Sequence, residues 1–202
     1  MSKITIHSFA DVDRSGKVRW TACELGYEIE EVRLELGEHR GEEYLKLNPY
    51  SQIPAARIDG ETWIESTAIC IMLAEKHPEA ALIPADPAQR SSFWQAVLLA
   101  SSTLETPTVN YFLASRGVVD ERWRELAGEG LKARLETFAA SVPSKGYLCG
   151  SFSIADICAA YVLRVAVQAG LLPCEGVLAD YFNRLKARPA ALESRIFDSL
   201  RS

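Results

Sequence analysis

A carboxylate and a hydroxyl stand side by side in Glu65 and Ser66, where an apolar helical pattern begins. Apolar residues then recur at helical spacing over residues 68–73, and Pro78 ends the pattern. The free N–H groups of a helix N-terminus attract a carboxylate, and an acidic side chain beside them attracts an ammonium group. The pair could therefore bind charged groups of a ligand. The alternative interpretation is an ordinary helix start, where Ser and Glu are common.

Cysteine and histidine favour neither a metal site nor a disulfide framework. The number of cysteines is odd, no two of them form a C-x-x-C pair, and three lie in helical patterns, where a thiol packs as a small hydrophobe. The histidines lie far apart, so we expect no metal and reduced thiols. These residues are Cys23, Cys70, Cys149, Cys158, Cys174, His7, His39 and His77.

The composition excludes several classes of protein. The chain has 202 residues, 48% apolar and 24% charged, which is ordinary for a globular protein. Its net charge of −5 disfavours nucleic acid as a partner, because phosphate binding needs a basic face. We find no signal peptide, and no uncharged apolar run reaches the roughly 18 residues that a membrane span needs. We expect a soluble, cytoplasmic protein with neither nucleic acid nor membrane as partner.

The first eighty residues alternate strand and helix signals. Strands are expected near residues 3–8, 28–34, 55–58 and 62–64, and helices over 16–25, 42–47 and 65–77. Asp59-Gly60 is the strongest hairpin signal and joins the last two strands. This order predicts a thioredoxin-like sheet with a parallel first pair and an antiparallel last pair.

A Pro-rich linker near residues 84–87 separates this region from one with helical periodicity only. Helices are expected near residues 88–114, 120–140, 153–169 and 177–187. We therefore predict an α/β domain over residues 1–79 and an all-helical domain over residues 86–202. Ser153 and Asp156 have the spacing of a capping box, with Phe152 or Ile154 packed beside it, and this pair is expected to be structural.

Three stretches carry a family resemblance: residues 48–54 (NPYSQIP), 63–69 (WIESTAI) and 150–156 (GSFSIAD). In this order and spacing they resemble the cytosolic glutathione transferase superfamily, in a bacterial-type member. The resemblance implies a glutathione transferase fold, with a thioredoxin-like α/β N-terminal domain and an all-α C-terminal domain. It also implies glutathione as co-substrate and places its γ-glutamyl group at Glu65 and Ser66.

The resemblance assigns the rest of the tripeptide to the segment before the hairpin. Pro54 would follow a cis peptide, and the backbone of Ile53 would pair with the cysteinyl backbone of glutathione as a short strand addition. The alternative is an ordinary edge-strand proline. Gln52 would bind the glycyl carboxylate, with help from His39 or Arg40, which are otherwise surface residues.

The resemblance breaks at the group that should activate the thiol of glutathione. When residues 17–19 (KVR) are matched to the family's R/K-V-R run, the usual serine position falls on Val12, which has no donor. Ser15, near the first helix N-terminus, is one replacement, with an N-cap role as its alternative. Arg14 is a second, by stabilising the thiolate with its charge. Backbone N–H groups of the same loop are a third.

The loop before the first helix also bears on the class of enzyme. Asp11 and Asp13 would oppose a thiolate, so we expect both to face solvent. A zeta-like isomerase is disfavoured because its serine-serine-cysteine loop is missing, and a beta-like enzyme because no cysteine lies in the loop. The electrophile is expected between the domains, with Tyr111 as a polar contact.

We interpret the chain as a homodimeric glutathione transferase that conjugates or reduces small hydrophobic electrophiles, as in detoxification. Two alternatives remain: a non-catalytic module that binds glutathione or a hydrophobe, and a regulatory protein-interaction member of the same fold. Val12 favours both alternatives. Gln52, Pro54, Glu65 and Ser66 disfavour the regulatory one.

Overall fold

The computed structural model describes residues 2–10, 13–118, 120–172 and 175–200. Contacts divide the chain into two compact units, one of Met1–Ala80 with Arg188–Ser202 and one of Ala81–Ala187. This division differs from the sequence-based one at the C-terminus, because the last segment groups with the first eighty residues and not with the helical unit.

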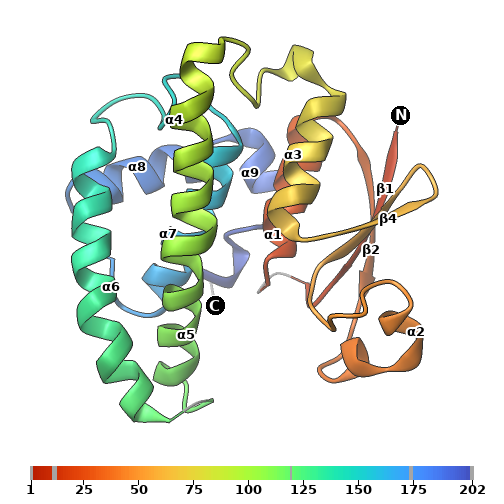
Figure 1. Cartoon of the computed structure of the whole chain (residues 1–202), viewed down its shortest axis with the longest axis horizontal. Helices are drawn as coiled ribbons and strands as arrows, with labels where there is room; N and C mark the ends of the chain where they lie inside the picture. The colour runs from red at the N-terminus through yellow and green to blue at the C-terminus, as the bar shows by residue number, and fades with distance from the viewer. Residues whose placement is uncertain (1, 11–12, 119, 173–174, 201–202) are drawn as a thin grey trace. The chain divides into compact units, whose positions relative to one another are not determined.

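The first unit is built on one four-stranded sheet with the strand order β2-β1-β3-β4 (Figure 1). β1 runs parallel to β2 and antiparallel to β3, and β3 and β4 form the expected antiparallel hairpin. The predicted thioredoxin-like topology is therefore confirmed. The strands are β1 (Lys3–Ser8), β2 (Glu28–Arg33), β3 (Ala55–Ile58) and β4 (Glu61–Ile64).

Two helices of the first unit, α1 (Ser15–Glu24) and α3 (Ser66–Lys76), pack side by side along the sheet (Figure 1). Ile4 and Ile6 of β1 are fully buried, as are apolar side chains of both helices. A short helix, α2 (Glu42–Leu45), lies between β2 and β3, and α9 (Pro189–Glu193) packs on α1. Single 3₁₀ turns occupy Glu38–Arg40, Pro78–Ala80 and Asp198–Leu200.

The second unit is helical. The segment predicted as one helix over residues 88–114 forms two α-helices joined by a π-helix at Leu99–Leu104. Pro107 lacks an N–H and cannot donate to the carbonyl of Thr103, which interrupts the α-helical ladder at this point. In the described part of the chain, no helix is long and apolar enough to cross a bilayer. The helices are α4 (Pro87–Leu98), α5 (Glu105–Ser115), α6 (Glu121–Ser141), α7 (Ile154–Gln168) and α8 (Val177–Lys186).

The predicted capping box of Ser153 and Asp156 is present at the start of α7, the buried central helix of this unit. The backbone N–H of Ser153 donates to Asp156 Oδ2 at 2.9 Å. Asp156 Oδ1 also accepts from the Leu148 N–H at 3.0 Å and from the Tyr181 hydroxyl at 2.6 Å. The carboxylate therefore joins three segments of the unit, two more contacts than its sequence spacing predicted.

Candidate functional site

Three chain segments meet at one end of the sheet. In the strand register His7 of β1 faces Ala55 of β3, and Ala55 faces Ile64 of β4. The loop after β1, the residues just before β3 and the residues just after β4 therefore lie at the same sheet end. These segments contain the residues that the sequence assigned to ligand binding, except His39, which follows β2. The register alone brings Pro54 beside Glu65, because they flank the paired Ala55 and Ile64.

The Ile53–Pro54 peptide is cis, as the resemblance implies. Just before it, the Gln52 carbonyl accepts from the Tyr44 hydroxyl at 2.6 Å and from Asn48 Nδ2 at 2.7 Å. Burial raises the pKa of Tyr44 to about 12, so the hydroxyl stays protonated and keeps donating. Among the described residues, none bonds to the backbone N–H or C=O of Ile53. The segment is thus held in place while the backbone of Ile53 stays available for an added strand.

Glu65 is the N-cap residue of α3, with a left-handed backbone at φ 65° and ψ 100°. Such a conformation is uncommon for a residue with a Cβ, and strained residues of this kind gather at functional sites. Its side chain is exposed and makes no capping hydrogen bond. Ser66, the first residue of the helix, is buried. An uncommitted carboxylate therefore stands beside the N–H groups that open α3.

His39 lies in the 3₁₀ turn after β2 and faces the loop after β1. Its ring packs edge-to-face on Phe9 with 5.1 Å between the ring centroids. The His39 carbonyl accepts from the Ser51 hydroxyl at 2.9 Å, which ties this turn to the segment before Pro54. Its Nδ1 atom is buried and has no hydrogen-bond partner among the described residues, whereas Gln52 is exposed. A buried ring nitrogen without a partner is a costly arrangement that a bound ligand could relieve.

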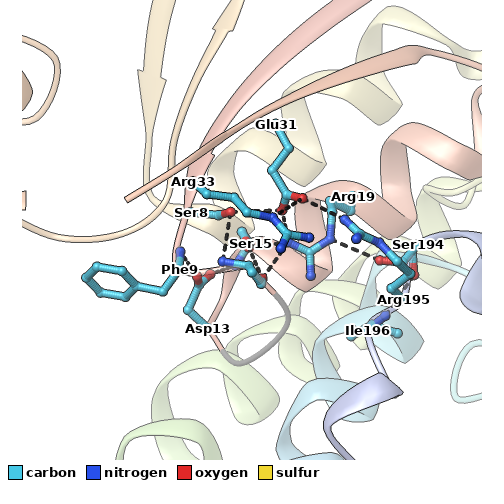
Figure 2. Close-up of polar contacts among 11 residues, drawn as sticks. Ser8, Phe9, Asp13, Ser15, Arg19, Glu31, Arg33, Ser194, Arg195 and Ile196 are labelled. Carbon is cyan, nitrogen blue, oxygen red and sulfur yellow. Dashed lines mark hydrogen bonds and ion pairs between the residues drawn. The ribbon is translucent and has the colours of Figure 1, made fainter. Parts of the chain in front are cut away.

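Asp13 does not face solvent, so our expectation for it was wrong. Its carboxylate turns into the loop and accepts from the backbone N–H groups of Phe9 and Ser15 (Figure 2). Burial raises the pKa of Asp13 above its ordinary value of 3.8, although its hydrogen bonds with Ser15 act in the opposite direction. The inward carboxylate closes the loop on itself. Asp11 and Val12 lie outside the described residues.

Ser15 is the first residue of α1 and is fully buried, whereas Arg14 occupies the N-cap position and is half-buried. The Ser15 hydroxyl accepts from Arg19 Nη1 at 2.7 Å and donates to the Ala10 carbonyl at 3.4 Å. Ser15 is therefore not the N-cap of its helix. Its hydroxyl is directed into a polar cluster beneath the loop.

That cluster, which we call the Glu31 cluster, consists of Ser8, Arg19, Glu31 and Arg195 (Figure 2). Arg19 Nη1 lies 2.8 Å from Glu31 Oε1, and Arg195 Nη2 lies 2.6 Å from Glu31 Oε2. The Ser8 hydroxyl donates to Glu31 Oε1 at 2.8 Å. Burial alone would raise the pKa of Glu31, but Ser8, Arg19 and Arg195 together hold it below its ordinary value of 4.5.

Sequence reasoning missed the Glu31 cluster. Arg19 belongs to the run at residues 17–19 that served only to align the chain, and Glu31 was read as part of an alternating strand. Nothing in the sequence connects Arg195 with either, because this contact spans 164 positions along the chain. The one available signal was a charged residue, Arg19, at a position of α1 that faces the core.

A family model for the glutathione S-transferase N-terminal domain matches residues 14–76. Maleylacetoacetate isomerase of Mus musculus is 30% identical over 162 residues, which cover 77% of this chain and 74% of the mouse protein. The chain belongs to the cytosolic glutathione S-transferase superfamily. Probable maleylacetoacetate isomerase 2 of Drosophila melanogaster is 33% identical over 140 residues, 67% of this chain. That match spans 61% of the fly protein, so the chain matches less than two thirds of it.

Solved structures of this superfamily share the fold. The theta class glutathione S-transferase of Xanthomonas axonopodis pv. citri, with glutathione bound, has a TM-score of 0.83 at 23% identity. It covers 97% of this chain and 98% of its own. Ure2p in complex with glutathione has a TM-score of 0.84 at 18% identity, covering 96% and 93%. At these identities the likeness confirms the predicted transferase fold and no more.

The names of the relatives and the loop of this transferase family member point in different directions. A zeta class glutathione S-transferase of Euphorbia esula is 40% identical over 82 residues, 40% of this chain and 36% of that protein. The isomerase names above belong to proteins similar over a longer stretch. Our sequence analysis disfavoured a zeta-like enzyme because the serine-serine-cysteine loop is missing. The names of similar proteins therefore suggest a zeta-like enzyme, whereas the composition of the loop before α1 does not.

Proposed function

We propose that this chain binds glutathione at the sheet end where residues 53–54 and 65–66 meet, and that it conjugates or reduces small hydrophobic electrophiles with it. The observation that carries this proposal is the register of the β3–β4 hairpin, which sets an available peptide backbone beside an uncommitted carboxylate at a helix N-terminus. Membership of the superfamily supports it.

The backbone of Ile53 would pair with the cysteinyl residue of glutathione, with Pro54 fixing its orientation. The Glu65 carboxylate would accept from the γ-glutamyl ammonium. The Ser66 hydroxyl and the first N–H groups of α3 would donate to the γ-glutamyl carboxylate. The two charges of one end of glutathione would thus meet opposite partners within two adjacent residues.

Gln52 and His39 would bind the glycyl carboxylate at the other end of the tripeptide. The exposed Gln52 side chain directly precedes the Ile53 backbone. His39 offers a buried Nδ1 that lacks a partner among the described residues. In the tautomer that carries its hydrogen on Nδ1, the ring would donate to a carboxylate. Arg40 is exposed and makes no side-chain contact within the described part of the chain that would support the same role.

For activation of the thiol we propose Arg14 and Ser15, with Arg14 the better placed of the two. Arg14 is half-buried at the N-terminus of α1, where the helix dipole and its own charge both favour a thiolate. The Ser15 hydroxyl is buried and already donates to the Ala10 carbonyl, so it would have to turn to donate to sulfur.

Calorimetry tests this function directly. Glutathione is titrated into the protein at neutral pH in buffers of different ionisation enthalpy, which counts the protons released on binding. Release of a substantial fraction of a proton, reduced in Arg14→Gln, is the expected result. If glutathione does not bind, the proposed site is wrong.

A second candidate function is glutathione binding without catalysis. The hydrogen bond that the Ser15 hydroxyl donates to the Ala10 carbonyl favours it, because it leaves the loop without a readily available hydroxyl donor at this position. This candidate predicts binding without proton release and no turnover with any class of electrophile. The names of the relatives make maleylacetoacetate the first electrophile to assay.

We further propose a cytoplasmic homodimer, as in the family. Large apolar side chains are exposed in each unit: Tyr50 at 72% in the first, and Leu98 at 58% and Trp94 at 36% in the second. Exposed apolar patches of this kind are typical of protein interfaces. Light scattering after gel filtration should give twice the monomer mass of 22.3 kDa, and Leu98→Ser should lower it. A measured mass equal to that of one chain for the wild type would rule the dimer out.

A further inference from the structure

The C-terminal segment of the chain lies along α1, the helix that begins at the proposed thiol site. Arg188 Nε and Nη2 bind the Glu24 carboxylate at the C-terminal end of the helix, at 2.8 and 2.9 Å. One turn before it, Trp20 packs edge-to-face on Phe197, with 5.7 Å between the ring centroids. The segment therefore follows the helix towards its N-terminus.

The same segment reaches the loop through two polar contacts. The Ser194 carbonyl accepts from Arg19 Nε at 3.0 Å, and Arg195 Nη2 binds Glu31 Oε2 at 2.6 Å (Figure 2). Arg19 in turn donates from Nη1 to the Ala10 carbonyl at 2.8 Å and to the Ser15 hydroxyl. One buried guanidinium thus holds both ends of the loop, and the C-terminal segment holds that guanidinium.

The end of α9 fixes the backbone of Arg195. This residue directly follows Ser194, the C-cap of α9, and its φ of 59° is the left-handed conformation with which helices commonly end. Its N–H donates to the Leu192 carbonyl at 3.2 Å. The Arg195 guanidinium therefore reaches the Glu31 carboxylate from a backbone that the helix end holds in place.

We propose that Arg195 is a positioning residue of the glutathione site: through Glu31 and Arg19 it fixes the loop between β1 and α1 and so tunes the ionisation of the bound thiol. Only the effect on the thiol rests on the proposed function. The anchoring of the loop can be measured without glutathione.

Arg195→Gln is the test, and Arg33→Gln is its matched control. Arg33 Nε lies 3.6 Å from the same carboxylate oxygen, but its side chain is 58% exposed, against 38% for Arg195. A more distant and more exposed pair contributes little. Arg195→Lys, which keeps a positive charge at this position, serves as the rescue variant.

Amide hydrogen exchange measures the anchoring in the free protein. In Arg195→Gln the amides of Phe9, Ala10 and Ser15 should exchange about fivefold faster, the scale of one partly exposed charge pair. The buried strand β1 reports global unfolding, so the amides of Ile4 and Ile6 should keep their rates. Arg33→Gln should leave all five unchanged, and Arg195→Lys should restore the loop rates in large part.

Glutathione titrations at several pH values measure the effect of Arg195 on the ionisation of the bound thiol. In Arg195→Gln the pH at which half of the bound thiol is ionised should rise, while Arg33→Gln should match the wild type. Equal acceleration of loop and β1 amides would reduce Arg195 to a general stabilising residue and overturn the proposal. If the loop amides exchange faster but the pH of half-ionisation of the bound thiol does not change, Arg195 does not influence the ionisation of the thiol, and that part of the proposal is wrong. If the wild type does not bind glutathione, the proposed function is wrong. The hydrogen-exchange data then still test whether Arg195 anchors the loop.

Discussion

Gly16 in α1 and Ile196 in the C-terminal segment approach so closely that a Cβ on Gly16 would meet Ile196 Cγ1 at 2.8 Å. Ile196 is fully buried by this packing. The missing side chain at position 16 is what allows the C-terminal segment to lie against the first turn of α1. The segment that carries Arg195 therefore depends on a glycine close to the proposed thiol site.

We expect Gly16→Ala to destabilise the protein by about 1–2 kcal/mol, because overpacking at Ile196 outweighs the gain in helix propensity. Gly130→Ala is the matched control, since Gly130 also lies in a helix and a Cβ there would meet nothing within 4 Å. That control should stabilise by up to about 1 kcal/mol. Urea unfolding measures both, and a neutral or stabilising Gly16→Ala would show that Ile196 moves away freely.

Ser66→Ala should weaken glutathione binding by roughly 1.5–3 kcal/mol, the usual scale for a hydrogen bond to a charged group. The neighbouring Thr67 hydroxyl accepts from Lys17 Nζ at 3.3 Å, so Thr67→Ala is the control and should keep the affinity. Calorimetry measures the dissociation constant of glutathione for the wild type and both variants. Equal affinities for the wild type and Ser66→Ala would place the γ-glutamyl group elsewhere.

Asp156→Ala should cost about 3 kcal/mol or more, because it leaves the N–H groups of Ser153 and Leu148 and the Tyr181 hydroxyl without their acceptor. Tyr181→Phe removes one of these contacts and should cost less. Thermal and denaturant unfolding measure both losses. Glutathione affinity should not change in either variant under folding conditions, and a well-folded Asp156→Ala with lost affinity would contradict the structural role.

Glu31→Gln should destabilise the first unit by about 3 kcal/mol at neutral pH, since it leaves the buried Arg19 without its carboxylate. The pKa of Glu31 is lowered in the folded protein, so its ionised form stabilises the fold above its ordinary pKa of 4.5. That contribution is lost as the pH falls through the folded value. The difference in unfolding free energy between wild type and variant should therefore shrink in acid, and a pH-independent difference would refute this account.

Local sequence patterns were sufficient to predict the sheet, its hairpin and the capping box. Asp59 and Gly60 have φ of 55° and 83°, both positive, as the two-residue turn inferred from their types requires. Once the register of β3 and β4 follows from that turn, Pro54 and Glu65 must lie together. The candidate ligand residues beside the hairpin were therefore readable from sequence, because neighbours along the chain position them.

The contacts of the loop before α1 could not be predicted in this way. Asp13 was expected in solvent and instead turns into its loop, because the backbone N–H groups of Phe9 and Ser15 both donate to its carboxylate. The role of Ser15 depends on Arg19, and the position of Arg19 depends on Glu31 and on the C-terminal segment. Ionic contacts between residues so distant in sequence leave no periodic or spacing signal. The sequence by itself determined the fold and the candidate site beside the hairpin, and only the tertiary structure decided what surrounds Ser15.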